Sequence, residues 1–232
     1  MRSRNGTGVR RDPVRTKSQI LEAAIAEFAG EGLSGARIAR IAQRAGTNVR
    51  MIYHYFGNKE DLYVAVLDAV YQNIRGEERK LNLQALDPVT GMERLIDFTF
   101  TYFATHPEFI SLLNNENLHG GRYLARSNLV PNLTPTLDTA IRDLLARGEE
   151  SGAFRPGVDP VQLYVSMVSL SYLHRSNIHT LSAMYRKDLG DPAWLEARRA
   201  HMHDMLMGYL LAQDSSKSSK PCPASRPTEP AG

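Results

Sequence analysis

The spacing of apolar residues constrains the fold of this chain more than any other feature of its sequence. Apolar side chains recur every three or four positions, as at Ile20, Ala24 and Phe28, and this spacing places them on one face of a helix. The alternation of apolar and polar residues that is typical of strands is absent. Glycine and proline interrupt the helical pattern at intervals of roughly 10 to 25 residues, and no longer unit repeats. The sequence therefore predicts an all-α protein of about nine helices.

Helix breaks divide the chain into an N-terminal group of short helices and a C-terminal group of longer ones. Gly30 and Gly32 are expected to end the first helix, and Asn48 and Asn58 are favoured capping residues for two of the next ones. Proline at a first turn and glycine after a last turn mark most other limits. The predicted helices span residues 13–29, 38–45, 49–55, 58 to at least 73, 88–105, 107–118, about 131–150, 159–180 and 192–212.

Basic residues are concentrated near the N-terminus. Residues 1–60 contain 11 Lys and Arg against 5 Asp and Glu, a net charge of +6, whereas residues 61–232 have a net charge of −3. Binding to a row of phosphates requires clustered cations. A small basic segment on a larger, mildly acidic body therefore indicates a module that binds a polyanion, joined to a second functional unit.

The two ends of the chain differ in composition from the region between them. Residues 1–12 contain almost no apolar side chains, and residues 214–232 are rich in Ser, Pro and Lys. Neither segment can bury enough apolar surface to offset the entropy lost on ordering it. The predicted organisation is a disordered basic arm over 1–12, a first folded unit over 13–60, a helical body over 61–213 and a disordered tail over 214–232.

Several classes of protein are excluded by what the sequence lacks. Cys222 is the only cysteine, so neither an intrachain disulfide nor a cysteine-based zinc site is available, and we expect a reducing, cytoplasmic location. No window approaches the roughly 18 consecutive apolar residues of a membrane span. No apolar segment typical of a signal peptide follows the N-terminus.

Catalytic and metal-binding patterns are missing as well. The sequence has no G-x-S-x-G, H-E-x-x-H or phosphate-binding loop motif. His201 and His203 are two positions apart, so they point to different sides of a helix and form a poor metal-binding pair. The adjacent acids in Glu77–Glu78 and Glu149–Glu150 diverge in the same way and are expected on solvated faces. We therefore predict no enzymatic activity, no metal and no cofactor.

Three short predicted helices lie in the basic segment, with Gly46 between the second and the third. This is the arrangement of a helix-turn-helix unit, whose recognition helix exposes polar and basic groups near its N-terminus and buries apolar ones. Residues 48–56 fit this description. The side chains expected to point inward are Ile52, Tyr55 and Phe56, and those expected to point outward are Asn48, Arg50, Tyr53 and His54.

Two runs of residues in this segment form a specific pattern. Ile41–Gly46 has the sequence I-A-x-x-A-G, and Ile52–Leu62 has the sequence I-Y-H-Y-F-x-N-K-E-D-L. With them, residues 14 to about 67 resemble the N-terminal DNA-binding domain of transcriptional regulators of the tetracycline-repressor (TetR) type. The resemblance implies a three-helix DNA-binding domain followed by a helical domain that binds a small molecule and forms a dimer.

The resemblance also implies a set of DNA contacts, with two departures from the family pattern. Arg37 stands where the family usually has Thr; it can reach a phosphate but cannot cap the second helix, so Ser34 or Gly35 is expected to cap it. Arg50 stands where the family usually has Gly, and arginine is the commonest bidentate partner of guanine. The implied DNA contacts are Arg37, Gln43, Arg44, Asn48, Val49, Arg50, Tyr53, His54 and Lys59.

Simpler roles remain open for some of these residues. His54 fits a solvated helical position as well as it fits a DNA contact, Arg50 fits an exposed cation, and Val49 fits simple packing. The arginines of residues 1–12 fit a soluble tail, and the sharper alternative is an arm that enters the minor groove.

The C-terminal body is implied to form a homodimer through residues 159–180 and 192–212. Two operator half-sites require two recognition helices, which a dimer supplies. Both segments have apolar residues at helical spacing, which fit a dimer interface and a monomer core equally well. These residues are Leu163, Met167, Leu170, Leu173, Leu195, Met202, Met205, Leu206 and Tyr209.

The most informative stretch of the body is residues 106–127, in which a polar run from Asn114 to Asn117 interrupts an apolar helix. The run needs partners if it is buried, and otherwise forms the polar end of a helix before Gly120. The stretch is similar to regulators that control the breakdown of nitrogen heterocycles such as pyrimidines and nicotinate. That resemblance implies a small aromatic or heterocyclic effector, contacted by some of Phe98, Tyr102, Asn117, Arg122, Tyr123 and His174.

These features together predict a ligand-responsive regulator that binds double-stranded operator DNA as a homodimer and represses transcription until a small-molecule effector releases it. An activator of the same family is an alternative. A rival from another class is a helical small-molecule-binding or enzymatic domain whose basic N-terminus serves only solubility.

Overall fold

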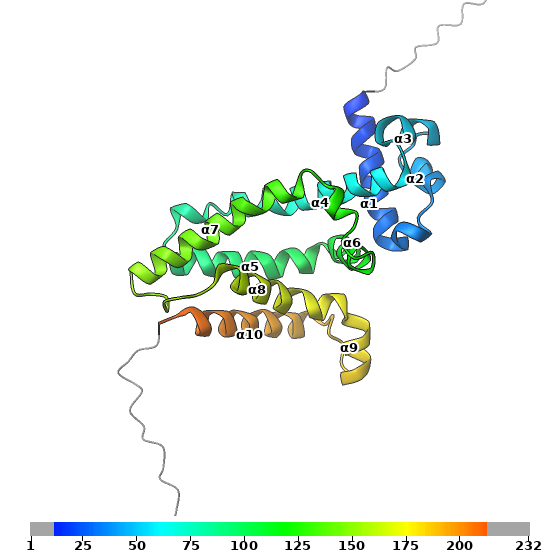
Figure 1. Cartoon of the computed structure of the whole chain (residues 1–232). Coiled ribbons are helices and arrows are strands. Elements are labelled where there is room, and N and C mark those ends of the chain that lie inside the picture. Colours follow the sequence, from blue (N-terminus) through cyan, green and yellow to red (C-terminus); the bar gives the residue numbers. More distant parts are fainter. Residues whose placement is uncertain (1–11, 213–232) are drawn as a thin grey trace, which may run out of the picture.

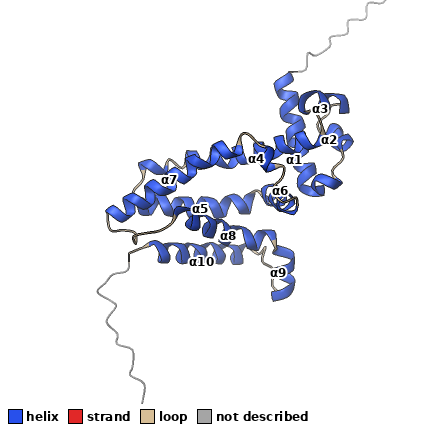
Figure 2. Cartoon of the chain, in the orientation of Figure 1, coloured by secondary structure: helices blue, strands red, loops and turns tan. Residues whose placement is uncertain are grey.

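The computed structural model describes residues 12–212, which form ten α-helices and two short 3-10 helices (Figure 1, Figure 2). Within this range no strand occurs apart from one isolated bridge between Phe154 and Leu211. The prediction of an all-α fold is confirmed. The disordered arm predicted over 1–12 and the tail predicted over 214–232 lie outside the described residues, except for Asp12.

The elements follow each other in a simple order along the chain. They are α1 (Pro13–Gly35), α2 (Ile38–Arg44), α3 (Val49–Phe56), α4 (Lys59–Lys80), η1 (Leu83–Ala85), α5 (Pro88–Thr105), α6 (Pro107–Leu118), η2 (Leu124–Arg126), α7 (Val130–Glu150), α8 (Pro160–Ser176), α9 (Ile178–Tyr185) and α10 (Pro192–Leu210).

Side-chain caps explain where six of these helices begin. At each of them the capping side chain accepts a hydrogen bond from an amide of the first turn. Four of the caps are aspartates followed directly by proline, which lacks an N–H in a position where that group would have no helical partner. The capping residues are Asp12, Asn48, Asn58, Asp87, Asp159 and Asp191. The predicted caps Asn48 and Asn58 are thereby confirmed.

The first helix continues further than predicted. It passes through Gly30 and bends at Gly32, whose φ of 65° lies in the left-handed region. A Cβ on Gly32 would lie 2.5 Å from Oδ1 of Asn115 in α6. The left-handed φ therefore favours glycine at this bend, and any larger residue there would also have to displace the amide group of Asn115. The expectation that Gly30 ends the helix is wrong, because an interior glycine only costs a helix about 1 kcal/mol.

The helix predicted over 159–180 is two helices. Asn177 departs from helical geometry, with φ −110° and ψ 23°, so α8 ends at Ser176 and α9 begins at Ile178. The hydroxyl of Ser176 donates to the carbonyl oxygen of Leu173 at 3.5 Å and lies 3.3 Å from Oδ1 of Asn177. Such local side-chain bonds compete with helical ones. α9 consequently projects from the end of the body (Figure 1).

Two hydrophobic cores organise the described residues. The first joins α1–α4 to α6 and to part of α5, and the second lies between α5, α7, α8 and α10. α4 is one unbroken helix of 22 residues that begins in the N-terminal unit and runs along the body (Figure 1). The boundary predicted between residues 60 and 61 falls within its first turn. No helix in the described range is long and apolar enough to cross a membrane.

Candidate nucleic-acid interface and its connection to the body

The turn between α2 and α3 is closed by backbone hydrogen bonds. The chain reverses at Gly46, whose φ of 61° is left-handed. The amide of Thr47 donates to the carbonyl of Ala42 at 2.9 Å. Oδ1 of Asn48 then accepts a hydrogen bond from the amide of Met51 at 3.0 Å and starts α3. The sequence around Gly46 therefore fixes the angle between the two helices locally.

α3 has a buried face and an exposed face. Ile52 is 1% exposed, and Tyr55 and Phe56 are partly buried against the first core, as predicted. On the opposite side, Tyr53 is 47% exposed and Val49 is 38% exposed. The other residues that were predicted to point outward are also exposed, namely Asn48, Arg50 and His54. α3 thus presents a polar, basic face to the solvent.

The remaining predicted DNA contacts flank this face. Arg37, Gln43 and Arg44 are exposed at the two ends of α2. Lys59 is half-buried at the start of α4, and its ammonium group donates to the carbonyl of Ser34 at 3.4 Å, beside the chain that leads into α2. All nine predicted residues therefore belong to the small unit of α2, α3 and the first turn of α4.

A buried carboxylate from α1 replaces the missing cap of α2. Arg37 occupies the N-cap position without a side-chain cap, and its amide donates to Oε1 of Glu27 at 2.9 Å. The same oxygen accepts from Nε of Arg40 at 2.7 Å. Burial favours a higher pKa for Glu27, but the hydrogen bonds from Arg37 and Arg40 outweigh it, so the pKa of this carboxyl is lowered. The expectation that Ser34 or Gly35 caps α2 is wrong.

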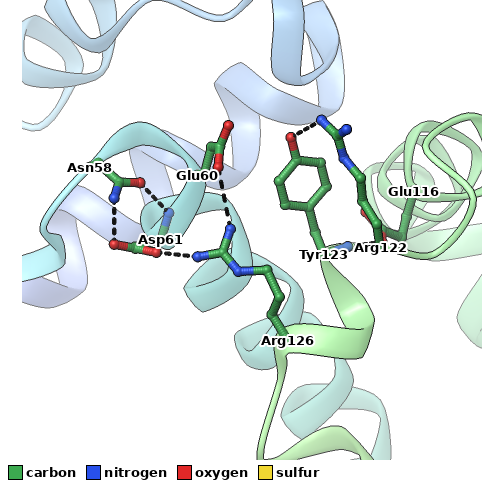
Figure 3. A network of polar contacts seen from close by, with 7 residues as sticks. All are labelled: Asn58, Glu60, Asp61, Glu116, Arg122, Tyr123 and Arg126. Atoms are coloured by element: carbon green, nitrogen blue, oxygen red, sulfur yellow. Dashed lines mark hydrogen bonds and ion pairs between the residues drawn. The ribbon is translucent and has the colours of Figure 1, made fainter.

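The loop between α6 and α7 docks on the first turns of α4 (Figure 3). We call residues 119–129 the junction loop. The guanidinium of Arg126 lies 3.4 Å from a carboxylate oxygen of Glu60 and 2.5 Å from one of Asp61. The hydroxyl of Ser127 donates to Asp68 at 2.5 Å. The junction loop is therefore bound to the helix that follows the helix-turn-helix directly.

An aromatic cluster ties the same loop to the N-terminal core. The ring of Tyr123 meets that of Tyr63 edge to face at 5.3 Å, and Tyr63 meets Phe28 of α1 at 5.1 Å. The amides of Tyr123 and Leu124 both donate to Oε1 of Glu116 at 2.8 Å. Burial, together with the charge of Glu116, raises the pKa of Tyr63. α6 and the junction loop thus pack against α1 and α4.

Most of the polar run of α6 has partners within the described residues, although Oε2 of Glu116 is buried without one there. The hydroxyl of Tyr172 donates to Oδ1 of Asn114, and Nδ2 of Asn115 donates to the carbonyl of Ser111 at 2.9 Å. Glu116 is 3% exposed and holds the junction loop, whereas Asn117 is exposed. Three of the four residues therefore join α6 to other parts of the protein or to its own backbone, and only Asn117 forms a solvated helix end.

The six residues predicted to contact an effector fall into separate groups. Tyr102 stacks on His106 at 3.9 Å, lies 5.6 Å from Phe98 and donates its hydroxyl to Asn73 at 2.8 Å. Arg122 and Tyr123 lie in the junction loop, with the Arg122 guanidinium over the tyrosine ring (Figure 3).

His174 belongs to a third group. Its ring is buried and stacks on Phe100 at 5.4 Å, with Trp194 at 5.7 Å. Burial, followed by the charges of Arg198 and Arg175, lowers the pKa of His174 to about 4. The structure brings Phe98 and Tyr102 together, and Arg122 and Tyr123 together. Among the described residues, no ring contact or side-chain hydrogen bond links His174 or Asn117 to either pair.

Both halves of the chain match models of the same protein family. Residues 20–66 match the family of bacterial regulatory proteins called the tetR family, and residues 88–206 match the tetracyclin repressor-like C-terminal domain. The chain belongs to the TetR family. It is a helix-turn-helix transcriptional regulator.

Individual TetR-family relatives extend over most of the chain. The transcriptional repressor NicS of Pseudomonas putida is 38% identical over 186 residues, which are 80% of this chain and 88% of NicS. The transcriptional regulator RutR of Escherichia coli is 30% identical over 172 residues, 72% of this chain and 77% of RutR. The solved structure of SCO4942 from Streptomyces coelicolor superposes with a TM-score of 0.62 at 27% identity, covering 85% of this chain and 99% of that one.

The apolar residues of the last long helices of this TetR-family regulator divide between two faces. Leu163, Met167, Met202 and Leu206 are buried in the second core. A second set remains exposed on α8 and α10, with exposures from 48% to 53%. It consists of Val161, Val165, Leu173, Met205 and Tyr209. Four of the nine apolar residues that the sequence assigned to either a dimer interface or a monomer core thus fill the monomer core. We call the exposed set the α8/α10 seam.

The body contains a buried ion pair that the sequence did not predict. Arg75 and Glu78 of α4 are 8% and 6% exposed, so the expectation that Glu78 lies on a solvated face is wrong. Glu149 and Glu150 are exposed, as expected. Arg75 and Glu78 follow Tyr71 and Ile74 by one helical turn each, and this continuation of an apolar face was the available signal.

Proposed function

We propose that this regulator is a homodimeric repressor that binds double-stranded operator DNA through α3 and dissociates when a small molecule binds its body. The exposed, basic N-terminal face of α3 is the observation on which the proposal rests. The activity is binding and not catalysis, and it takes place in the cytoplasm, where the chromosome lies.

Each exposed residue of the N-terminal unit has a defined task in this proposal. Arg50 lies in the first turn of α3, the part of a recognition helix that contacts base edges, and pairs with guanine. Val49 and Asn48 lie beside it in the major groove. The other side chains bind phosphates and set the register on the duplex. They are Arg37, Gln43, Arg44, Tyr53, His54 and Lys59.

Dimerisation through the α8/α10 seam supplies the second recognition helix. Exposed Val161, Val165 and Leu173 are separated by four and eight residues, so they lie along one side of α8. Met205 and Tyr209 do the same on α10. Packing these faces against a second copy forms a four-helix arrangement and removes apolar surface from water. Two α3 helices then reach half-sites about one helical turn, roughly 34–36 Å, apart.

Release requires that the effector change the position of the two α3 helices. α4 and the junction loop connect the helix-turn-helix to the body, so a ligand that moves either of them alters the separation of the recognition helices. In the TetR-family context, the sequence resemblance to regulators of heterocycle breakdown supports a small aromatic or heterocyclic compound as the effector.

The DNA-binding part is tested by fluorescence anisotropy with a duplex from upstream of the protein's own coding sequence. Arg50→Ala is expected to lower affinity by about 1–3 kcal/mol, roughly 5- to 150-fold, because a base contact is lost. Arg37→Ala is expected to weaken binding and to reduce the slope of log affinity against log salt by about one.

The matched control is Arg94→Ala, which removes an exposed arginine of α5 far along the chain from α3. It is expected to leave affinity and slope unchanged. The proposed interface is wrong if Arg50→Ala and Arg37→Ala behave like this control. A promoter fusion that becomes more active when the protein is present would overturn repression in favour of activation.

A further inference from the structure

A cavity of about 290 Å³ opens between the C-terminal part of α4, η1 and α7. Its volume is close to the lower end of the range for small-molecule sites, about 300–1,000 Å³. A cavity of this volume suits a small ligand, such as one ring with its substituents. None of the six residues predicted to contact an effector lines it.

The wall that α4 contributes is charged and partly buried. Nη1 of Arg75 donates to both carboxylate oxygens of Glu78 at 2.5 Å, and Nη2 donates to the hydroxyl of Tyr164 at 3.1 Å. The guanidinium is therefore held from two sides in a fixed orientation. A buried ion pair adds little net stability compared with apolar residues of the same size. Its position on the wall of a cavity gives it a second use, as a preformed donor for a ligand.

The charges that line the cavity do not cancel. Arg75 and Glu78 neutralise each other, and Arg79, one helical turn after Arg75, adds a second guanidinium on the same side of α4. The lining residues of η1 and α7 are uncharged. The formal charge at the cavity is therefore +1, which matches a ligand with a single negative charge. Opposite the charges, Leu83, Leu137 and Ala140 provide an apolar wall for the body of that ligand.

We propose that this cavity is the effector site and that its ligand is a monocarboxylate on a single small ring. The carboxylate binds Arg79 and the spare donors of Arg75, while the ring lies against Leu83, Leu137 and Ala140. The binding site stands on its own geometry, and only its role as effector site rests on the function proposed above.

The position of the cavity explains how its occupant would affect DNA binding. α4 and α7 form its two long walls, and both helices lead to the junction loop at their other ends: α4 starts at Lys59 beside Glu60 and Asp61, and α7 starts directly after Ser127 and its neighbours. Arg147 of α7 donates to the carbonyl oxygens of Leu86 and Leu83, which anchors the η1 wall to α7. A ligand wedged between these walls moves α4 relative to α7.

Calorimetric titration of the full chain tests the site. The probes are benzoate, its pyridine analogues with one carboxylate, and cyclohexanecarboxylate, each beside its neutral carboxamide. At least one carboxylate is expected to bind, and its carboxamide is expected to bind about 10- to 100-fold more weakly, because a charge-assisted hydrogen bond is lost. Equal binding of acid and amide, or no binding of any carboxylate at millimolar concentration, overturns the proposal.

Three variants locate the binding. Arg79→Gln removes the unpaired charge, and the double variant Arg75→Met with Glu78→Met removes the buried pair together so that no charge is left alone. Both are expected to weaken binding by at least about tenfold with an unchanged circular dichroism spectrum. Leu137→Trp fills the cavity and is expected to abolish binding. Undiminished binding in all three folded variants overturns the assignment.

A separate DNA titration distinguishes this proposal from the function proposed above. The bound carboxylate is expected to lower operator affinity in the wild type and not in Leu137→Trp. If the carboxylate binds but operator affinity stays the same, the effector role is overturned while the binding site stands. If the protein binds its operator but no carboxylate, the site is overturned while the proposed repressor function stands.

Discussion

At the scale of single residues, a buried charged side chain fixes the position of one helix relative to another, which the backbone hydrogen bonds within a helix cannot do. Glu27 is 3% exposed and accepts hydrogen bonds from the amide of Arg37 and the guanidinium of Arg40. It lies on the apolar face of α1 between Ala24 and Phe28. It therefore fixes the position of α2, and with it that of α3, relative to the first core.

Glu27→Ala is expected to lower the free energy of unfolding by about 1–3 kcal/mol, because the amide of Arg37 loses its partner in a partly buried position. Glu27→Gln keeps an acceptor oxygen and should cost less. Since the pKa of Glu27 is lowered in the folded state, the charged carboxylate stabilises the protein above about pH 4.5, and this contribution fades as the pH falls through the folded pKa. Urea denaturation between pH 7 and pH 3.5 measures both effects.

The control for Glu27 is Glu31→Ala, which removes a half-exposed acid that pairs with the same arginine, Arg40. A surface pair contributes at most about 1 kcal/mol. If Glu27→Ala and Glu31→Ala lower the free energy of unfolding equally, the buried carboxylate is not the cap that α2 needs.

His174 makes the body sensitive to mild acid. Its folded pKa of about 4 lies below the unfolded value of about 6.5, so the unfolded chain binds the proton more tightly. The free energy of unfolding should therefore fall as the pH is lowered from about 6.5, by about 2 kcal/mol at pH 5 from this residue. His174→Phe, which keeps a ring against Phe100, should remove that part of the loss in urea denaturation at pH 7 and pH 5.

His201→Gln serves as the matched variant, because His201 is an exposed histidine of α10. It should lose stability with acid as the wild type does. An unchanged pH dependence in His174→Phe would contradict the role given to His174.

At the scale of elements, most helices start where the sequence predicts. The breaks and contacts of the segments that connect them become visible only in the structure. The aspartate-proline caps at Asp87, Asp159 and Asp191 are local signals, so α5, α8 and α10 begin as expected. The break at Asn177 has no glycine or proline and was missed. The junction loop is likewise invisible in sequence periodicity, because its partners lie on α4, about 60 residues earlier.

Arg126→Ala should loosen the junction loop without unfolding the protein. Its ion pairs with Glu60 and Asp61 are exposed, so the melting temperature should change little. Amide hydrogen exchange in the first three turns of α4 should become faster, because opening there no longer breaks these pairs. Mass spectrometry of exchange in peptides covering Lys59–Asp68 measures it.

Arg142→Ala provides the comparison for Arg126→Ala, since it breaks an exposed pair with Asp138 within α7. Exchange in α4 should match the wild type in this variant. If Arg126→Ala also leaves exchange in α4 unchanged, the junction loop does not restrain the start of that helix.

At the scale of the whole molecule, the α8/α10 seam is an apolar face that the second core does not use. Leu163 and Met167 point into that core, whereas Val161, Val165 and Leu173 remain about half exposed. The same two helices thus supply both a monomer core and a second, exposed apolar face.

Val165→Glu should convert the dimer into monomers, because two copies of the seam would then bury unpaired carboxylates. Analytical ultracentrifugation measures the change, and operator affinity should fall by at least about tenfold because the second half-site is lost. Leu118→Glu, at an 85% exposed apolar residue of α6, should remain dimeric. A dimeric Val165→Glu variant would place the interface elsewhere.

The sequence alone determined the helical fold, the helix-turn-helix with its outward and inward residues, several caps and the family. These features depend on residues a few positions apart, so the local sequence of a single helix or turn is enough to set them. Tertiary structure decided the cap that Glu27 gives to α2, the burial of Glu78, the split between core and seam on α8 and α10, and the separation of the predicted effector residues. Each of these depends on a partner from another element, as when Tyr164 reaches Arg75 across 89 positions of the chain. Periodicity shows which side of a helix is apolar, but only packing determines what lies against that side.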